Sequence, residues 1–96
     1  MIIKEYIDRY NDYAKAGDRL YTDARPLIDR GEKLNFDMIG LDAVSTVFLN
    51  ASLGHLMDDY GIERVKKSFR FTNLLRSQAD RIRKYFTDYE EVYQKA

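Results

Sequence analysis

The sequence of 96 residues contains no cysteine and no tryptophan, and it has only one proline and one histidine. Without cysteine the chain forms no disulfide, thiolate zinc site or iron–sulfur ligation, and it offers no thiol nucleophile. Positive and negative side chains balance, so neither sign is in overall excess. No apolar run approaches the roughly 20 residues that a membrane-spanning helix needs. These absences predict a soluble domain and exclude several classes of metalloenzyme and thiol enzyme.

The residues that are present suffice for one hydrophobic core. Apolar side chains make up 45% of the chain and aromatic ones 14%. A chain of this length supports a single domain, which we expect to span residues 1–96. The first residues lack the basic segment and the long apolar region of a secretory signal, so we expect a cytoplasmic protein.

The segment 2–14 fits two patterns. Apolar and polar residues alternate over positions 3–7 as in an edge strand, whereas Ile3, Tyr6, Ile7, Tyr10 and Tyr13 have the spacing of one helix face. We favour the strand and leave the helix as the alternative. Residues 11–21 include Gly17 and few aliphatic side chains, which predicts a loop.

A first helix is expected after that loop, capped by Thr22 or Asp23 and ending near Gly31. The alternation of apolar residues over 34–38 then predicts a strand, and Gly40 turns the chain. A broad apolar face over Thr46–Tyr60 predicts the main core helix, with Gly61 as its left-handed cap.

Phe69 and Phe71 suggest a third strand. A final helix follows, whose apolar stripe consists of Ile82, Tyr85, Phe86, Tyr89, Val92 and Tyr93. Strands that alternate with helices favour an α/β fold with a small mixed or parallel sheet covered by helices, with an α+β arrangement as the alternative. In such folds the binding sites gather at the carboxyl ends of the strands.

Residues 34–61 resemble the signature of the STAS-like domain family of unknown function. The shared features are a strand that ends in Asp, a short corner, a Ser/Thr pair and a Phe-x-Asn sequence that opens a helix. They fall here on Asp37, Gly40, Ser45, Thr46, Phe48, Asn50 and Gly54. The segment 69–74 resembles the next strand of the family, and the whole likeness covers roughly residues 22–73.

The pattern is more distantly similar to true STAS domains, among them the anti-sigma factor antagonists, which act by binding a partner. In those antagonists a partner kinase of the histidine-kinase ATPase fold phosphorylates a serine at the corner, so the resemblance implies a kinase or another ATPase of that fold as the partner here. The resemblance implies that Thr46 corresponds to this phosphoacceptor, with Ser45 in the place of the preceding Asp. It also implies a protein-binding surface over residues 42–50, with Asp42, Ser45, Thr46 and Asn50 as its candidate contacts.

The same corner residues have a structural interpretation. A hydroxyl at a helix start accepts a bond from an unpaired backbone amide, so Ser45 or Thr46 is a candidate helix cap. Asp37 and Gly40 are expected to orient the corner, because an Asp after a strand often accepts backbone bonds at a turn. His55 and the adjacent acidic pair Asp58 and Asp59 give only a weak metal signal.

A competing hypothesis comes from the charge distribution. Residues 64–84 contain eight basic residues and one acidic residue. Such a region can bind nucleic acid or another anionic partner, and the candidate contacts are Arg76, Arg81, Arg83 and Lys84. The sequence predicts no cofactor, no metal site and no catalytic residue, because it contains no nucleophile–base pair and no phosphate-binding loop. It leaves the oligomeric state open.

Overall fold

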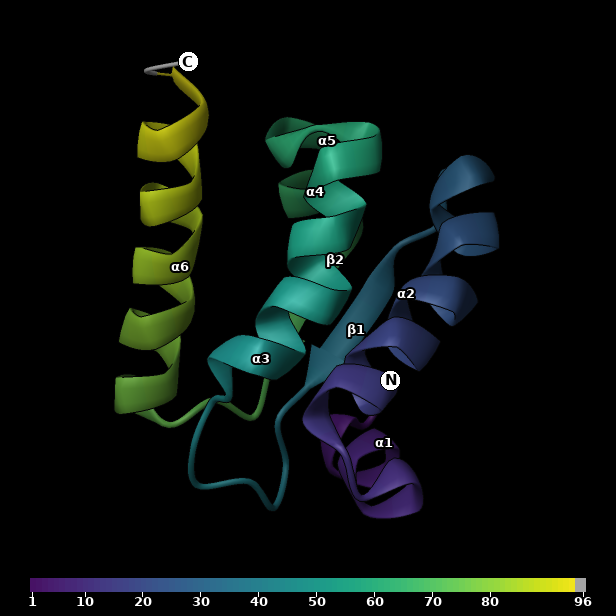
Figure 1. The fold of residues 1–96 in the computed structure, drawn as a ribbon, viewed down its shortest axis with the longest axis vertical. Helices are drawn as coiled ribbons and strands as arrows, with labels where there is room; N and C mark the ends of the chain where they lie inside the picture. The colour runs from purple at the N-terminus through teal and green to yellow at the C-terminus, as the bar shows by residue number, and fades with distance from the viewer. Residues whose placement is uncertain (95–96) are drawn as a thin grey trace.

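The computed structural model describes the backbone of residues 1–94 and the side chains of residues 1–92. Figure 1 shows helices around a small sheet, which confirms the predicted α/β fold class. The elements in chain order are α1 (Ile3–Tyr10), α2 (Tyr13–Asp29), β1 (Leu34–Asp37), α3 (Thr46–Leu49), the π-helical η1 (Asn50–Gly54), α4 (His55–Tyr60), α5 (Ile62–Ser68), β2 (Phe69–Thr72) and α6 (Arg76–Gln94).

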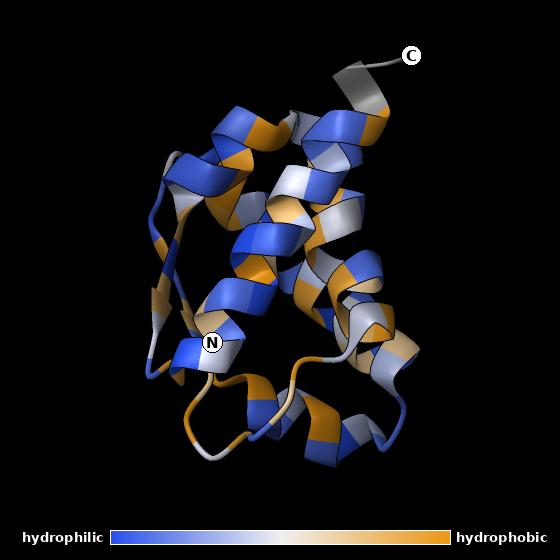
Figure 2. Ribbon diagram, turned by 90° about the vertical axis from the view of Figure 1, so that its left-hand side faces the viewer, coloured by the Kyte–Doolittle hydropathy of each residue, from blue (hydrophilic) through white to orange (hydrophobic). Residues whose placement is uncertain are grey.

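The sheet consists of β1 and β2, which pair in parallel with Leu34 opposite Phe69 and Asp37 opposite Thr72. The helices lie on one side of the strands in Figure 2. The side chains follow the pleat, since Leu34 and Phe36 are buried while Asn35 and Arg70 are exposed. The sheet therefore has one face in the core and one polar face toward solvent.

The predicted N-terminal strand is wrong, because residues 3–10 form α1. Ile3 is fully buried, and Tyr6, Ile7 and Tyr10 pack against the core from the same helix face. Only Ile2 has strand-like pairing, through a single bridge to Asp37. The helical spacing of the apolar residues, which we had set below the strand-like alternation, is therefore the pattern that the structure follows here.

The predicted loop at residues 11–21 is also wrong. Helix α2 begins at Tyr13 behind an Asp12 cap, whose carboxylate accepts a hydrogen bond from the backbone N–H of Lys15 at 3.0 Å. The helix therefore starts well before the predicted caps Thr22 and Asp23, and it ends at Asp29, close to the expected end. Its buried residues are mostly small and are spaced as one helical face: Ala16, Gly17, Leu20, Ala24 and Ile28.

The predicted core helix is confirmed as the continuous run of α3, η1 and α4 over residues 46–60. The π-helical turn at 50–54 was not predicted. Gly61 has a positive φ of 86° as expected, but its ψ of 153° is extended, so it joins α4 to α5 and does not form a left-handed helical cap. Helix α5 was missed, because only Val65 in it is buried.

Phe36 lies at the centre of the core. Its ring centroid is 6.2 Å from that of Phe48, 6.1 Å from that of Phe69 and 5.2 Å from that of Phe71. Aromatic pairs at these separations stabilise a core beyond the apolar area that they bury. This cluster joins both strands to the start of the core helix.

Helix α6 stands as a separate column beside the core helix in Figure 1. It contacts the rest of the fold mainly through long side chains, and its buried residues are Gln78, Ile82 and Phe86. Tyr85 and Tyr89 pack at the edge of the core as the stripe predicts, whereas Val92 is 66% exposed. The side chain of Tyr93 lies outside the described residues.

Candidate docking site at the strand-to-helix corner

The corner begins at Asp37, at the carboxyl end of β1. Its Oδ1 atom accepts hydrogen bonds from the backbone N–H of Ile39 at 3.0 Å and from Nδ2 of Asn73 at 2.9 Å. The Asn73 amide, and then the Ile39 N–H, hold the pKa of Asp37 below its usual value, because both stabilise the ionised form. Asp37 therefore ties the end of β1 to the chain that leaves β2.

Gly40 occupies a turn that only glycine adopts readily. Its φ is +81°, and the turn is closed by a 3.1 Å hydrogen bond from the N–H of Leu41 to the carbonyl of Met38. A Cβ atom at this position would also lie 3.0 Å from Cδ of Lys4. The turn directs residues 41–45 back toward the core helix.

The next anchor of the corner is Gln78, which the sequence reasoning missed. Its side chain is buried, and its Nε2 atom donates to the carbonyl of Leu41 at 2.6 Å while its Oε1 atom accepts from the N–H of Leu75 at 2.9 Å. The second bond is half of a capping box at the start of α6. The sequence signal for this capping box is the three-residue spacing from Leu75 to Gln78. It was missed because leucine stands at the cap position, where the motif usually has serine or threonine.

Ser45 and Thr46 have different environments. Ser45 is the cap of α3, because its Oγ accepts a hydrogen bond from the N–H of Phe48 at 3.3 Å. Thr46 is exposed, and its Oγ1 accepts a hydrogen bond from Nη2 of Arg81 on α6. Phe48 itself is 2% exposed and points into the core.

Asn50 continues the contact between the core helix and α6. Its Oδ1 accepts a hydrogen bond from the hydroxyl of Tyr85 at 2.8 Å, and further along Asp58 accepts one from Tyr89 at 2.6 Å. A groove of about 430 Å³ runs between the two helices beside these contacts and begins at Thr46. Thr46 and Asn50 are thus brought together on one surface.

Asp42 is exposed and shares a hollow with Arg81. It lines a small hollow of about 160 Å³ together with Val44, Ser77 and Arg81. Arg81 is therefore next to two of the candidate contacts, although the sequence pattern assigned it to a different hypothesis. Asp37 is the last residue of β1 and Gly40 lies in the turn after it, so both set the path of the chain into the corner.

The basic candidates do not form one free patch. Arg83 pairs with Asp80 at 3.1 Å, and Lys84 pairs with Asp88 at 3.0 Å. Arg81 and Arg83 are two positions apart, so their side chains leave α6 on nearly opposite sides. Arg76 is exposed at the start of the helix.

His55 does not take part in a metal cluster. Among the described residues no group of three or more His, Cys, Asp or Glu side chains converges. The imidazole instead stacks on the ring of Tyr21 with centroids 3.7 Å apart and planes within 3°, and the Tyr21 hydroxyl donates to Asp59.

None of the described helices combines the length and apolar character required to cross a membrane.

Comparison with known protein families adds one finding. Residues 16–79 match the family model described as a STAS-like domain of unknown function. The match contains both strands, the corner and helices α3 to α5, and it confirms the resemblance that the motif indicated. No curated protein and no solved structure matches the chain.

Proposed function

Because the chain belongs to the family of STAS-like domains of unknown function, we propose that it is a non-catalytic regulatory module that binds a signalling protein through the corner 42–50. The observation that carries this proposal is the exposed Thr46 at the start of the core helix, held by Arg81. Asp42, Val47 and Asn50 are exposed around it, and Val47 is 54% exposed. An exposed apolar side chain among polar ones is a common arrangement in protein interfaces.

The corner is suited to binding because its exposed residues stand on a rigid support. Phe48 and Leu49 are both buried directly below them. Asp37 and Gln78 hold Ile39 and Leu41, just before the corner, by hydrogen bonds, and the Ser45 cap holds the chain where α3 begins. A surface that is ordered before binding loses less conformational entropy when a partner docks.

We further propose Thr46 as the phosphoacceptor that switches this docking. Ser45 is the poorer candidate, since its hydroxyl is half-buried and engaged as the helix cap. A kinase would transfer the γ-phosphoryl group of ATP to Oγ1 of Thr46, with release of ADP and the hydroxyl proton. The product would carry roughly two negative charges at neutral pH.

Arg81 gives such a phosphate a partner within the chain. A phosphate on Thr46 would lie beside the guanidinium that already contacts this side chain, and such charge-assisted pairs are strong. The pair would hold α6 against the corner and place a bulky charged group on the docking surface. We propose that a partner bound to the unmodified corner is thereby released.

The partner class comes from the resemblance to the antagonists, which implies a kinase or another ATPase of the histidine-kinase fold. The cytoplasm is the compartment in which we place this interaction. Catalysis is not needed in this scheme, because the chain acts by presenting and withdrawing a surface.

The test is a capture experiment with tagged full-length chain from nuclease-treated host lysate. It compares the wild type with Thr46→Glu, with the control Thr22→Glu on the exposed face of α2, and with the double variant Arg81/Arg83→Glu. Each variant is first shown to be folded by circular dichroism. Loss of an ATPase-fold partner with Thr46→Glu but not with Thr22→Glu is the expected result.

A different pattern would overturn the proposal. Retention of all partners by Thr46→Glu, with loss only in Arg81/Arg83→Glu and a requirement for nucleic acid or low salt, would identify an anionic partner. Incubation of the captured kinase with ATP, followed by mass spectrometry of the chain, then tests the phosphorylation separately. Modification elsewhere than Thr46 would exclude the proposed switch.

A further inference from the structure

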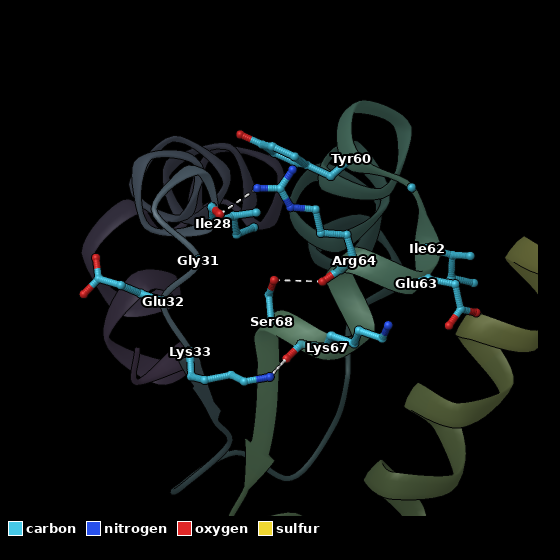
Figure 3. A pocket seen from close by; sticks show the side chains of 11 residues that line it. Ile28, Gly31, Glu32, Lys33, Tyr60, Ile62, Glu63, Arg64, Lys67 and Ser68 are labelled. Carbon is cyan, nitrogen blue, oxygen red and sulfur yellow. Dashed lines mark hydrogen bonds between the residues drawn. The ribbon is translucent and has the colours of Figure 1, made fainter.

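A large hollow lies at the opposite end of the strands from the corner. Its volume is about 710 Å³, and Figure 3 shows it from close by. The walls come from the turn after α2, from the junction of α4 and α5 around Tyr60 and Gly61, and from the end of α5. The strands begin beneath it at Leu34 and Phe69.

Two cations are fixed on opposite walls of this hollow, as Figure 3 shows. Nη2 of Arg64 donates to the carbonyl of Ile28 at 2.9 Å, and its guanidinium lies over the ring of Tyr60, 5.1 Å from the centroid. Nζ of Lys33 donates to the carbonyl of Lys67. These contacts restrain both side chains before any ligand arrives.

Both cations keep donors that these contacts do not use. A guanidinium has five N–H donors and an ammonium has three, and one of each is engaged with a backbone carbonyl. Neither Arg64 nor Lys33 forms an ion pair with an acidic group among the described residues. The Ser68 hydroxyl lies on the wall between them, but its only O–H donor is engaged with the carbonyl of Arg64 at 2.7 Å.

The acidic residues at the rim do not neutralise this charge. The Glu32 carboxylate is paired with Nε of Arg30 at 2.7 Å and is turned out of the hollow in Figure 3. The Glu63 side chain also points away from its centre. By contrast, Lys66 on the outer side of α5 is paired with Glu90 at 2.8 Å.

The hollow is open beside two of its residues, both of them glycines. Gly31 and Gly61 both have positive φ angles, and a Cβ atom on either would meet no other atom within 4 Å. The space exceeds by far the roughly 30 Å³ that one water molecule occupies in the liquid. Ile28, Tyr60 and Ile62 provide apolar surface within it.

We propose that this hollow binds a small phosphate monoester. The unused donors of Arg64 and Lys33 bind the phosphate oxygens, and the apolar surface receives the organic part. A phosphate is favoured over a carboxylate because it offers three terminal oxygens to donors that come from separate walls, whereas a carboxylate offers two. This site is independent of the corner and of the function proposed for it.

The test is a titration of the uniformly ¹⁵N-labelled full chain, followed by NMR at constant ionic strength and at a pH above 7, where the ester is mostly dianionic. The probes are ribose 5-phosphate, inorganic phosphate, ribose and acetate. We expect the amide signals of Gly31, Gly61 and Ser68 to shift with the two phosphates. We also expect at least tenfold tighter binding of ribose 5-phosphate than of ribose or acetate.

Three variants locate the site. Arg64→Gln and Lys33→Gln are each expected to weaken binding of ribose 5-phosphate about tenfold, whereas Arg83→Gln, which removes an exposed arginine on α6, should leave it unchanged. Urea unfolding of each variant separates loss of binding from loss of structure. If Arg64→Gln is poorly folded, because Ile28 loses its hydrogen bond, Lys33→Gln alone decides.

Three results would overturn the proposal. Equal affinity for acetate and phosphate would exclude the phosphate class. Shifts scattered over the basic residues of α6 would mean non-specific attraction. Unchanged affinity in folded Lys33→Gln and Arg64→Gln would mean that these cations only hold backbone carbonyls.

Discussion

The Gly17→Ala substitution tests the close contact that fixes the core helix against α2. A Cβ atom at position 17 would lie 2.6 Å from Cβ of Ala51 and 2.8 Å from the carbonyl oxygen of Phe48. Favourable contacts between carbon atoms lie at about 3.5–4.0 Å. One neighbour is a rigid methyl group and the other is backbone, so neither can rotate away. The two helices must therefore separate.

Two opposing effects determine how much Gly17→Ala changes the free energy of unfolding. In an ordinary helix interior, replacing glycine by alanine stabilises by about 0.5–1 kcal/mol. Insertion of a methyl group into a packed interface costs about 1–3 kcal/mol. We expect the second effect to be the larger, so that Gly17→Ala lowers the free energy of unfolding by about 1–2 kcal/mol. For a domain of this size that corresponds to a fall in melting temperature of roughly 5–15 °C.

The assay is urea unfolding followed by circular dichroism, with Gly54→Ala as the matched control. A Cβ atom at position 54 would lie 2.6 Å from the Tyr85 hydroxyl, the far end of a flexible side chain, and 3.6 Å from the nearest backbone atom. Loss of the Tyr85 hydrogen bond costs about 0.5–1.5 kcal/mol, and the gain in helix propensity offsets most of it. Gly54→Ala should therefore change stability by less than about 1 kcal/mol.

The comparison decides whether the close approach is real. If Gly17→Ala is as stable as the wild type, or is less harmful than Gly54→Ala, the packing of α2 on η1 described above is wrong. A second check is the double variant with Ala51→Gly, which removes the closest contact. It should show a favourable coupling with Gly17→Ala in a double-mutant cycle.

Three further predictions concern the cap, the core and the titrating groups. Ser45→Ala should destabilise by about 0.5–2 kcal/mol in urea unfolding and Thr46→Ala by less, because only Ser45 is the cap; the reverse order would move the cap to Thr46. Phe48→Ala should cost about 3–5 kcal/mol by the same assay, and a loss below about 1 kcal/mol would place its ring outside the core. Burial, followed by the hydrogen bond to a carboxylate, raises the pKa of Tyr6. The contribution of Tyr6 to the free energy of unfolding is therefore fully present below the ordinary tyrosine pKa of about 10, and it is lost as the pH rises above that value. Hydrogen bonds to Asp59 and Asp29 also raise the pKa values of Tyr21 and Tyr60. Ultraviolet titration should therefore show several tyrosines ionising late, and Tyr6→Phe should remove one of them.

The elements that sequence patterns predicted correctly are those whose side chains carry a strong period. The alternation over 34–38 gave β1, and the apolar face of residues 46–60 gave the core helix. Helix α2 was mistaken for a loop in its first half because small residues at Ala16, Gly17 and Ala24 form its buried face. Small size is what the close approach to η1 requires, and small residues give little hydrophobic signal.

Competition between patterns explains the other errors. Residues 3–7 fit a strand and a helix equally, and the deciding contacts are distant, such as the 2.8 Å bond from the Tyr6 hydroxyl to Asp23 on α2. Helix α5 has a single buried residue, so no window of its sequence shows a helical face. Local periodicity contains no information on either point.

Some hydrogen bonds of the corner can be predicted from the sequence, and others cannot. The bond from Ile39 to Asp37 spans two residues, and a bond of that kind is expected from the sequence alone. The contact between Thr46 and Arg81 spans 35 residues, and that between Leu41 and Gln78 spans 37. Such pairs depend on where α6 returns to the fold, which a single sequence does not specify.

The position of α6 relative to the family match bears on the docking that we propose for the corner. The match ends at residue 79, so it includes Gln78, which fixes the path of the corner, but not Arg81 and Tyr85, which contact Thr46 and Asn50. The match therefore includes the corner and its anchor Gln78, while the α6 wall of the groove beside the corner comes from residues beyond the match. A partner that covers the corner also meets this wall, since Thr46 borders both. If the proposed docking is correct, selectivity among partners is expected to depend on α6, with the corner as the shared docking surface.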